Sequence, residues 1–531
     1  MVPMIAGDRP AKQETIQHLF AHAVRDHGEK KLIISDVDGS VFTYTDAGAV
    51  VRRIMSALGD EGLSKGDAIC MYAPVHVESF LLFWAAASLG VVFVPLDFHW
   101  SEKMLERVLG LVKPKILFCE RKSFLGFSII KEQVQTVLFD ESGKGDIDCP
   151  PVFSAWLDRA DREISTPEIT PADEAVILYT SGSTGDPKGV VLSHEALYRF
   201  GRLVKELYDL MPDDIALSHG DMHSIAGMRA AISPLHSGSS FLVTSISQRS
   251  NVFSITECIR RHRCTQFSTT PAAVRQFVQF RDRIPASDLG SLRSILCAGS
   301  PLPQYVVDAF YEHFHVPVLN GYGMTEATGL CICHSLESFR HSRGSIGLPV
   351  GGCIAEIVDA MGRVCADGVT GELRVRSDKL MKGYFRNREL TDTIMRGGWL
   401  YTGDLAQKRP DGHFVLMGRI KNVIKNASGE LICVEEVELA LEWHSLVREA
   451  AVCGFTSTRG DERMAAFIVP DPQSERPEDL VKDLRRYLLE ELGAHKVPAE
   501  FIMKDRLPRN SMGKLLREHL KQEVVTTGEF P

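Results

Sequence analysis

The chain has 531 residues, which is too long for a single hydrophobic core, so we expect two or more domains. Its composition, 44% hydrophobic and 24% charged, is that of an ordinary water-soluble globular protein. The formal net charge is −9 and no basic block is interleaved with aromatic residues, which excludes nucleic acid as an expected partner.

No signal-peptide pattern opens the chain, and no run of about 18 apolar residues occurs in it. We therefore expect no integral membrane association and a cytoplasmic location. The 12 cysteines are scattered without the spacing of a zinc site, so we expect them to be reduced and mostly buried.

The first part of the chain alternates helical and strand patterns. Residues 12–30 have the periodicity of an amphipathic helix, and a second helical pattern ends at Leu58. Strand-like runs at residues 67–72 and 91–96 flank an apolar helical segment at residues 79–88. This alternation is typical of a parallel, doubly wound sheet.

The periodicity fades between about residues 120 and 170, where charged residues mix with Ser, Gly and Pro. Such a composition is typical of exposed connections. We therefore expect an exposed crossing between two subdomains here.

A Gly-, Ser- and Thr-rich segment follows the apolar run of residues 175–178, which predicts a buried strand that ends in a loop. Residues 179–190 read Tyr-Thr-Ser-Gly-Ser-Thr-Gly-Asp-Pro-Lys-Gly-Val. The glycines let backbone N–H groups approach an anion, the hydroxyls add donors and the lysine adds a positive charge. This is not a Walker A loop, because proline precedes Lys188 and glycine follows it. The alternative to a phosphate loop is a flexible surface turn. The predicted phosphate-binding residues are Thr180, Ser181, Gly182, Ser183, Thr184, Gly185 and Lys188.

Two later segments predict strands that end in turns, at residues 294–303 and 316–327. The second contains Asn-Gly-Tyr-Gly-Met-Thr-Glu, which is not a dinucleotide fingerprint because Glu326 stands at the third glycine position. The side chains at its end suit a nucleotide. Tyr322 could stack on a base, Thr325 could bond a phosphate, and the carboxylate of Glu326 is a ligand that Mg²⁺ prefers.

The last part of the chain changes in composition after Arg419, where we place a domain boundary. Asp404 ends the segment Trp-Leu-Tyr-Thr-Gly-Asp, in which an aspartate after glycine is ordinarily a turn former. Residues 477–492 predict a helix with four leucines on one face, which stops at Gly493. Lys514 lies in a Gly-containing loop, where a lysine is ordinarily solvated.

Taken in this order, the segments from about residue 40 to 518 resemble the adenylate-forming superfamily. This superfamily includes the acyl-CoA synthetases, peptide-synthetase adenylation domains and beetle luciferases. The most specific matches are residues 179–190 and 320–326. The resemblance implies an α/β fold with a large N-terminal domain, residues 1–418, built from two doubly wound subdomains and a β-barrel-like subdomain. It also implies a small, mobile α+β C-terminal domain, residues 419–531.

The resemblance implies a role for each matching residue. Asp404 would accept hydrogen bonds from the ribose hydroxyls, Arg419 would contact ribose or phosphate, and Lys421 would be the hinge of the C-terminal domain. Residues 425–434 depart slightly from the pattern, with one residue more than usual before the glycine and Val434 in place of a proline. The predicted catalytic residues are Lys514, Thr325, Glu326 and His223, with Glu326 also the metal ligand. The other residues expected to bind the nucleotide are Gly299, Ser300, Pro301, Asn320, Gly321, Tyr322, Gly323, Asp404 and Arg419.

The implied activity is that of a two-step ligase that uses ATP, Mg²⁺ and coenzyme A. A carboxylate attacks the α-phosphate of ATP to give acyl-AMP and pyrophosphate, and a thiol then displaces AMP to give a thioester. Three alternatives remain: a carrier-protein phosphopantetheine as the acceptor, a luciferase-like oxygenase, and a binding module without activity. The last is disfavoured because the matching charged residues are all present.

The sequence indicates the carboxylic acid substrate only through the residues expected around its binding pocket. An isolated histidine more often makes a structural hydrogen bond, which we expect of His219 and His236. His223, by resemblance, lines the acyl pocket. Amino-acid-activating relatives place an aspartate at a position that falls near Ser224 or Ile225, and Asp221 lies too early to be a strong counterpart. We therefore expect an acid that lacks an α-ammonium group and is apolar or aromatic beyond its carboxylate.

Overall fold

The computed structural model of the chain describes residues 13–139, 150–160, 165–181, 187–249, 251–300, 302–339, 344–425, 431–456, 462–471, 477–509 and 515–526. The chain divides into two compact units. Unit 1 comprises Met1–Arg343, Gly347–Ile354 and Arg376–Leu400. Unit 2 comprises Gly344–Ile346, Ala355–Val375 and Tyr401–Pro531.

The first sheet of unit 1 has nine strands in the order β15-β14-β13-β12-β11-β9-β10-β1-β2. Its central strands are parallel, and β2, β14 and β15 at the two edges are antiparallel to their neighbours. The strands are β1 (Lys31–Ser35), β2 (Val41–Thr43), β9 (Ile215–Ser218), β10 (Ser240–Val243), β11 (Gln266–Thr269), β12 (Ser294–Ala298), β13 (Val318–Met324), β14 (Gly329–Cys333) and β15 (Leu348–Pro349).

The second sheet of unit 1 has seven strands in the order β18-β8-β7-β4-β3-β5-β6. Strands β3 to β7 are parallel, and β8 and β18 are added antiparallel at one edge. The strands are β3 (Ala68–Tyr72), β4 (Val92–Pro95), β5 (Ile116–Cys119), β6 (Gln135–Leu138), β7 (Glu174–Ser181), β8 (Pro187–Ser193) and β18 (Gly383–Tyr384).

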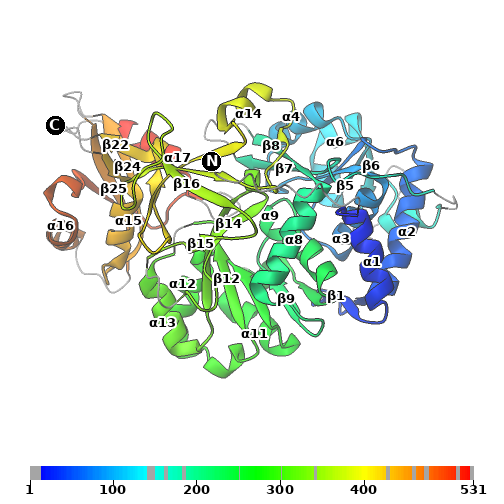
Figure 1. Ribbon diagram of the computed structural model, residues 1–531, viewed down its shortest axis with the longest axis horizontal. Helices are drawn as coiled ribbons and strands as arrows, with labels where there is room; N and C mark the ends of the chain where they lie inside the picture. The colour runs from blue at the N-terminus through cyan, green and yellow to red at the C-terminus, as the bar shows by residue number, and fades with distance from the viewer. Residues whose placement is uncertain are drawn as a thin grey trace, which may run out of the picture. The chain divides into compact units, whose positions relative to one another are not determined.

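Helices cover both faces of both sheets, as the doubly wound pattern predicts (Figure 1). Alternate strand residues enter different cores, because successive side chains point to opposite faces. In β3, Ile69 and Met71 belong to a core that both sheets share, whereas Cys70 and Tyr72 belong to an outer core. The shared core is filled by α1 (Ile16–His27), α2 (Tyr44–Asp60), α3 (Val77–Leu89), α8 (His194–Tyr208) and α9 (Ile225–Ile232).

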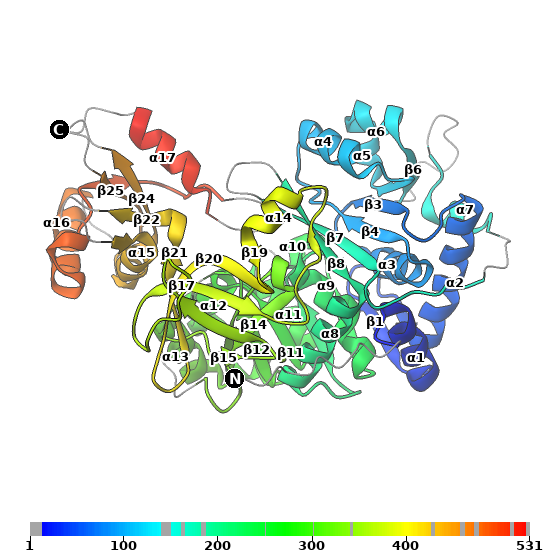
Figure 2. The ribbon, with the colours of Figure 1, turned by 45° about the horizontal axis from the view of Figure 1, so that its top comes forward.

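The outer faces are covered by two further groups of helices. Figure 2 shows α4, α5 and α6 on the side of β3 and β4 that lies away from α3. The outer helices of the second sheet are α4 (Glu102–Val112), α5 (Arg121–Gly126) and α6 (Ser128–Gln133). Those of the first sheet are α11 (Val252–His262), α12 (Pro271–Gln279) and α13 (Gln304–Phe314). Shorter helices of unit 1 are α7 (Phe153–Leu157), α10 (Ile246–Arg249), α14 (Arg388–Ile394), and the 3₁₀ turns η1 (Ser233–His236) and η4 (Thr325–Ala327).

Local sequence explains where these helices begin. Thr43 caps α2 and forms a reciprocal capping box with Asp46, which satisfies two N–H groups that have no partner within the helix. Helix α3 is apolar on all sides, and this fits its position in the core between two sheets.

The expectation of an exposed crossing at residues 120–170 is wrong for much of that segment. Strand β6 extends the second sheet, helices α5 and α6 pack in its outer core, and Trp156 of α7 is only 2% exposed. These elements are too short for a hydrophobic period to identify them, and burial of their few apolar residues fixes them instead.

Unit 2 contains an antiparallel sheet and the C-terminal elements. The sheet joins β16 (Ile354–Val358), β17 (Gly371–Arg376), β20 (Trp399–Lys408) and β21 (Phe414–Arg419). The start of β20 and the short strand β19 (Met395–Arg396) that pairs with it are assigned to unit 1. The sheet corresponds to the subdomain predicted to be barrel-like. The predicted boundary after residue 418 lies at the end of β21, within unit 2. Movement of residues 419–531 as a separate domain stays a prediction.

Beyond β21, a three-stranded sheet carries helices on both faces. Helices α15 and α16 pack against one face, and α17 packs against the other. The predicted helix 477–492 is confirmed, and its residues Leu484 and Leu488 are fully buried. These elements are η5 (Ile420–Asn422), β22 (Val423–Lys425), β23 (Leu431–Cys433), α15 (Val434–Trp443), β24 (Val447–Thr456), β25 (Glu462–Pro470), α16 (Pro477–Leu492), η6 (Ala494–Lys496), β26 (Glu500–Met503) and α17 (Arg517–Thr526).

No helix in the described ranges combines the length and the apolar character needed to cross a lipid bilayer.

Three histidines of unit 1, His194 buried and two others partly buried, predict a loss of stability in mild acid. Burial lowers the pKa of His194, His219 and His236 to about 4, from an ordinary value of 6.5. The unfolded chain therefore binds more protons than the folded chain as the pH falls below 6.5, and stability is lost. Between pH 7.5 and 5.5 we expect a loss of about 1.4 kcal/mol for each histidine.

Denaturant unfolding at both pH values measures this loss. His236 Nε2 donates to the Tyr198 carbonyl at 2.9 Å, a bond that a glutamine amide can replace. His236→Gln should therefore lose about 1.4 kcal/mol less than the wild type over this pH interval. If His236→Gln loses as much stability as the wild type between the two pH values, His236 is protonated at pH 5.5 in the folded protein.

Candidate active site

The carboxyl ends of four parallel strands meet at one edge of the first sheet. These strands, β9, β11, β12 and β13, are hydrogen-bonded neighbours. The chain leaves them at His219, Thr270, Gly299 and Thr325 respectively. In open α/β sheets this edge is where ligands bind. The predicted residues Gly299, Ser300, Thr325 and Glu326 are therefore brought to a common edge by the fold.

Two glycines at this edge are needed by the backbone itself. Gly299 has φ of +102°, a left-handed conformation in which a side chain would be strained. A Cβ at Gly323 would lie only 2.2 Å from the Gly329 carbonyl oxygen, so no larger residue fits between β13 and β14. The neighbouring Tyr322 is 8% exposed. Its predicted stacking on a base stays a prediction.

The predicted phosphate loop connects two antiparallel strands. Thr180 near the end of β7 pairs with Lys188 near the start of β8, and Ser181 pairs with Pro187. Lys188 therefore lies on a strand, whereas the sequence placed it in the loop. Its Nζ lies 5.7 Å from the centre of the Tyr384 ring. Gly182, Ser183, Thr184 and Gly185 lie outside the described residues, as does Pro301 of the turn after β12.

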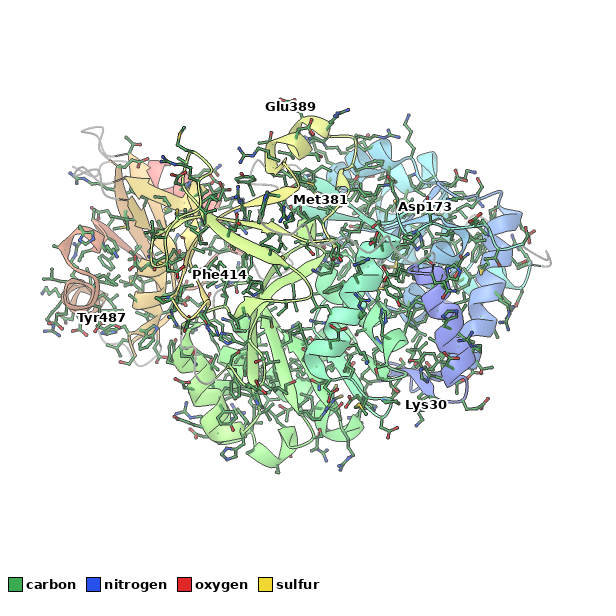
Figure 3. The ribbon with its side chains drawn as sticks, in the orientation of Figure 1. Lys30, Asp173, Met381, Glu389, Phe414 and Tyr487 are labelled. Atoms are coloured by element: carbon green, nitrogen blue, oxygen red, sulfur yellow. The ribbon has the colours of Figure 1, made fainter. Side chains whose placement is uncertain are left out.

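Tyr384 connects the two sheets of unit 1 at the site. Strand β18 holds it against Val190 of β8, while its hydroxyl donates to Oε1 of Glu326 at 2.8 Å. The backbone N–H of Met381, labelled in Figure 3, donates to the Glu326 carbonyl at 2.9 Å. Burial and the adjacent carboxylate both raise the pKa of Tyr384, so its hydroxyl keeps the proton that it donates.

Sequence reasoning did not assign Tyr384 to the site. The segment Met-Lys-Gly-Tyr-Phe around it belongs to the resemblance and was the available signal. Its partner Glu326 lies 58 residues away along the chain, and nothing local indicates the contact.

His223 lies in the connection between β9 and α9 and is 9% exposed. Its ring contacts that of Phe98 edge to face, with centroids 5.9 Å apart. Burial lowers its pKa, so the imidazole is neutral at neutral pH. His219 and His236 make hydrogen bonds to Thr269 and Tyr198, as expected of structural histidines.

Asp221 is already paired. Its Oδ1 accepts from the guanidinium of Arg249 at 2.6 Å, and the same guanidinium donates to the His219 carbonyl at 3.0 Å. This buried arginine neutralises the carboxylate and orients the loop before His223. Asp221 is therefore not available as a counter-ion for a substrate ammonium group.

Within unit 2, two of the predicted nucleotide-binding residues pair with each other. Asp404 and Arg419 are opposite each other on β20 and β21, and Arg419 Nε donates to Asp404 Oδ1 at 2.8 Å. Asp404 is 2% exposed. Lys421 is exposed in η5, the turn that follows β21. Lys514 lies outside the described residues.

The AMP-binding enzyme family matches residues 20–385, and the AMP-binding enzyme C-terminal domain matches residues 436–514. The first match alone covers more than half of the chain. The chain therefore belongs to the AMP-binding enzyme family.

Known proteins match over almost the whole chain. The sulfoacetate–CoA ligase of Cupriavidus necator is 28% identical over 97% of this chain and 99% of that protein. The feruloyl-CoA synthase of an Amycolatopsis species is 29% identical over 91% of this chain and 94% of that protein. The structure of o-succinylbenzoate CoA synthetase from Bacillus subtilis with its acyl-adenylate intermediate has a TM-score of 0.83 and 26% identity, covering 95% and 97% of the two chains. The benzoate CoA ligase of Burkholderia xenovorans LB400 shares the fold, with a TM-score of 0.86, 24% identity, and coverage of 96% and 99%.

These matches confirm the superfamily, the fold class and the enzyme class predicted from the sequence. The protein is an acid–thiol ligase of the AMP-forming, acyl-CoA synthetase type. Such an enzyme activates a carboxylic acid with ATP as acyl-AMP and then transfers the acyl group to a thiol.

Proposed function

We propose that this enzyme activates a carboxylic acid that lacks an α-ammonium group and transfers it to coenzyme A. In the first step, a carboxylate oxygen attacks the α-phosphorus of ATP and the bond to the pyrophosphate oxygen breaks, which gives acyl-AMP and pyrophosphate. In the second step, the thiol of coenzyme A loses its proton and attacks the acyl carbon, and AMP leaves with the bonding electrons.

One observation carries the assignment of the phosphate site. A cation, Lys188, and a carboxylate, Glu326, come from different sheets and both lie beside the side chain of Tyr384. Lys188 would bind the phosphates and stabilise the charge that develops on them, in a geometry that the two strands fix before the substrate arrives.

The fit of Mg²⁺ to the site depends on Glu326. Among the residues that the structure describes, no three His, Cys, Asp or Glu side chains gather to hold a metal ion. Mg²⁺ is usually held by one or two carboxylates together with substrate phosphates and water, so a single carboxylate at the strand end fits it. When bound, Mg²⁺ neutralises phosphate charge. Tyr384 would fix the orientation of the Glu326 carboxylate.

We expect Tyr384→Phe to slow acyl-AMP formation by roughly 10-fold, because a hydrogen bond to a charged group contributes about 1.5–3 kcal/mol. The loss should appear mainly as a higher Mg²⁺ concentration for half-maximal rate, measured by pyrophosphate release. Tyr44→Phe is the matched control. It removes a buried hydroxyl that lies 2.9 Å from two carbonyl oxygens, those of Pro234 and Ser239, away from Glu326. An unchanged Mg²⁺ dependence in Tyr384→Phe would contradict the positioning role.

We assign the roles of the remaining site residues from the resemblance to the adenylate-forming superfamily. We assign the ribose hydroxyls to Asp404, with Arg419 holding its carboxylate from the opposite strand. Lys514 would stabilise the charge on the α-phosphate during acyl-AMP formation, and Lys421 would be the hinge between the two half-reactions. Thr180, Ser300 and Thr325 would add hydroxyl donors to the nucleotide.

The proposal that the acid lacks an α-ammonium group is supported by the charges around His223. Arg249 already pairs with Asp221, and the register where relatives hold their aspartate falls at Ser224, whose hydroxyl caps α9, or at Ile225, neither of which carries a charge. An ammonium group placed there would be buried without a counter-ion, which is costly. Neutral His223 would line the acyl pocket.

A panel of acids tests the function. Pyrophosphate release should occur with simple carboxylic acids and be weaker with α-amino acids of matched side chain. Thioester formation should occur with coenzyme A and not with a phosphopantetheinylated carrier protein. Faster turnover of the α-amino acids would contradict the assignment of the acid, and thioester formation only on the carrier protein would contradict that of the acceptor.

A further inference from the structure

Arg229 is a buried cation for which the described part of the chain supplies no anionic partner. It lies on α9, which begins two residues after His223, and it is 9% exposed. Among the described residues, only two ionisable groups act on its guanidinium: the hydroxyl of Tyr208 and the thiol of Cys333. Burial lowers the pKa of Arg229, yet an arginine remains protonated at neutral pH.

Neither neighbour supplies a negative charge. Burial raises the pKa of Tyr208 to about 12, and its hydroxyl lies 2.9 Å from that of Ser268. Burial likewise raises the pKa of Cys333 to about 12. Both groups are therefore neutral at neutral pH, and the positive charge of Arg229 is left uncompensated.

Arg249, the other buried arginine among the described residues of unit 1, differs in this respect, as does the partly buried Arg199. Arg249 pairs with Asp221 at 2.6 Å. Arg199 is bound by Glu14 and Glu195, both at 2.9 Å. A buried charge without a partner is strongly unfavourable, so its presence indicates a missing anion.

Arg229 is also well placed relative to the predicted site. Its neighbour Cys333 pairs with Gly321 of β13, the strand that leads to Glu326. Arg229 is the fifth residue of α9, so it lies about 6 Å along the helix from its start near His223. Arg229 thus lies on the helix that begins near the acyl-pocket histidine, and its guanidinium is close enough to be acted on by Cys333 of β14, the strand paired with the strand of the nucleotide site.

We infer that the acid carries a second anionic group, a carboxylate, sulfonate or phosphonate, and that Arg229 binds it. The inference rests on the proposed function and names the class of its substrate. It replaces the sequence-based expectation of an acid that is apolar beyond its carboxylate. The planar fork of N–H donors of arginine matches two oxygens of such a group.

Matched pairs of acids test this inference by pyrophosphate release. The pairs are propionate with succinate and with 3-sulfopropionate, and the monocarboxylates from butyrate to hexanoate with the dicarboxylates of equal chain length. In the wild type, we expect kcat/KM of the best doubly anionic acid to exceed that of its partner by about 10²-fold.

Arg229→Met should abolish this preference, lowering kcat/KM for doubly anionic acids and leaving the monocarboxylates unchanged or faster. Arg229→Lys should retain part of the preference, because it keeps the charge and loses the fork. Arg202→Met is the control, since Arg202 lies on neighbouring α8 with its side chain 47% exposed. It should keep the full preference.

Thermal unfolding separates substrate binding from a structural role. The best doubly anionic acid should stabilise the wild type and not Arg229→Met, and the variant should be at least as stable as the wild type without ligand. The inference is wrong if Arg229→Met is less stable than the wild type and equally slow with every acid. It is also wrong if inorganic sulfate stabilises the wild type as well as the best doubly anionic acid does. It also falls if monocarboxylates are preferred, although the proposed function then stands. Pyrophosphate release with no acid at all would instead overturn the proposed function.

Discussion

Replacing Lys514 by alanine is expected to slow acyl-AMP formation by about 10²–10³-fold and to leave thioester formation from supplied acyl-AMP largely intact. The reason is that one cation serves one half-reaction. A single donor aimed at the charge that develops in a transition state contributes about 3–4 kcal/mol, and the thioester step develops its charge on a different atom.

Pyrophosphate release with the acid measures the first half-reaction, and acyl-CoA formed from synthetic acyl-AMP measures the second. Lys521→Ala is a suitable control, because Lys521 lies on the next helix, α17, and its nearest carboxylate is that of Glu518 at 3.4 Å. Equal losses in both half-reactions would contradict the assignment of Lys514.

Replacing Lys421 by proline is expected to impair one half-reaction by more than about 10²-fold and to leave the other close to normal. Proline fixes φ near −65° and disfavours a helical conformation in the residue before it. Here that residue is Ile420, the first residue of the turn η5, whose carbonyl accepts the N–H of Val423. The variant would therefore restrict the segment around which the C-terminal domain must rotate. From the resemblance to the adenylate-forming superfamily, we expect acyl-AMP formation to survive.

Both half-reactions must be measured on one folded preparation of this variant. Lys421→Ala removes the same side chain and keeps the backbone freedom, so comparison of the two variants isolates the backbone effect. If Lys421→Pro slows both half-reactions in parallel, Lys421 is a solvated linker residue and the hinge lies elsewhere.

Local patterns in the sequence identified most of the elements and the chemistry of the site. Apolar runs that end in Gly-rich segments marked β7, β12 and β13, because a buried strand needs consecutive apolar residues and a phosphate site needs N–H groups that only open backbone provides. The helix Pro477–Leu492 was predicted within its bounds, since its leucines recur at the helical period. Its apolar face is buried in the core that it shares with α15, β24 and β25.

The helices and strand of residues 120–139 could not be predicted from local sequence patterns. These elements are only four to six residues long, shorter than the window that reveals a period. Whether such a short run becomes a strand or a helix depends on the neighbour against which it is buried, and that neighbour is β5.

Sequence by itself determined which chemical groups this protein has and in which order they occur: the hydroxyls and Lys188 near the phosphate loop, Glu326 after β13, then Asp404 and Arg419. Only the tertiary structure decided which charges are satisfied. Glu326 is held by Tyr384, Asp221 is neutralised by Arg249, and Arg229 has no counter-ion among the residues that the structure describes. The physical reason is that a period or a motif reports interactions between near neighbours in the chain, whereas the compensation of a buried charge depends on residues that only folding brings within a few ångströms.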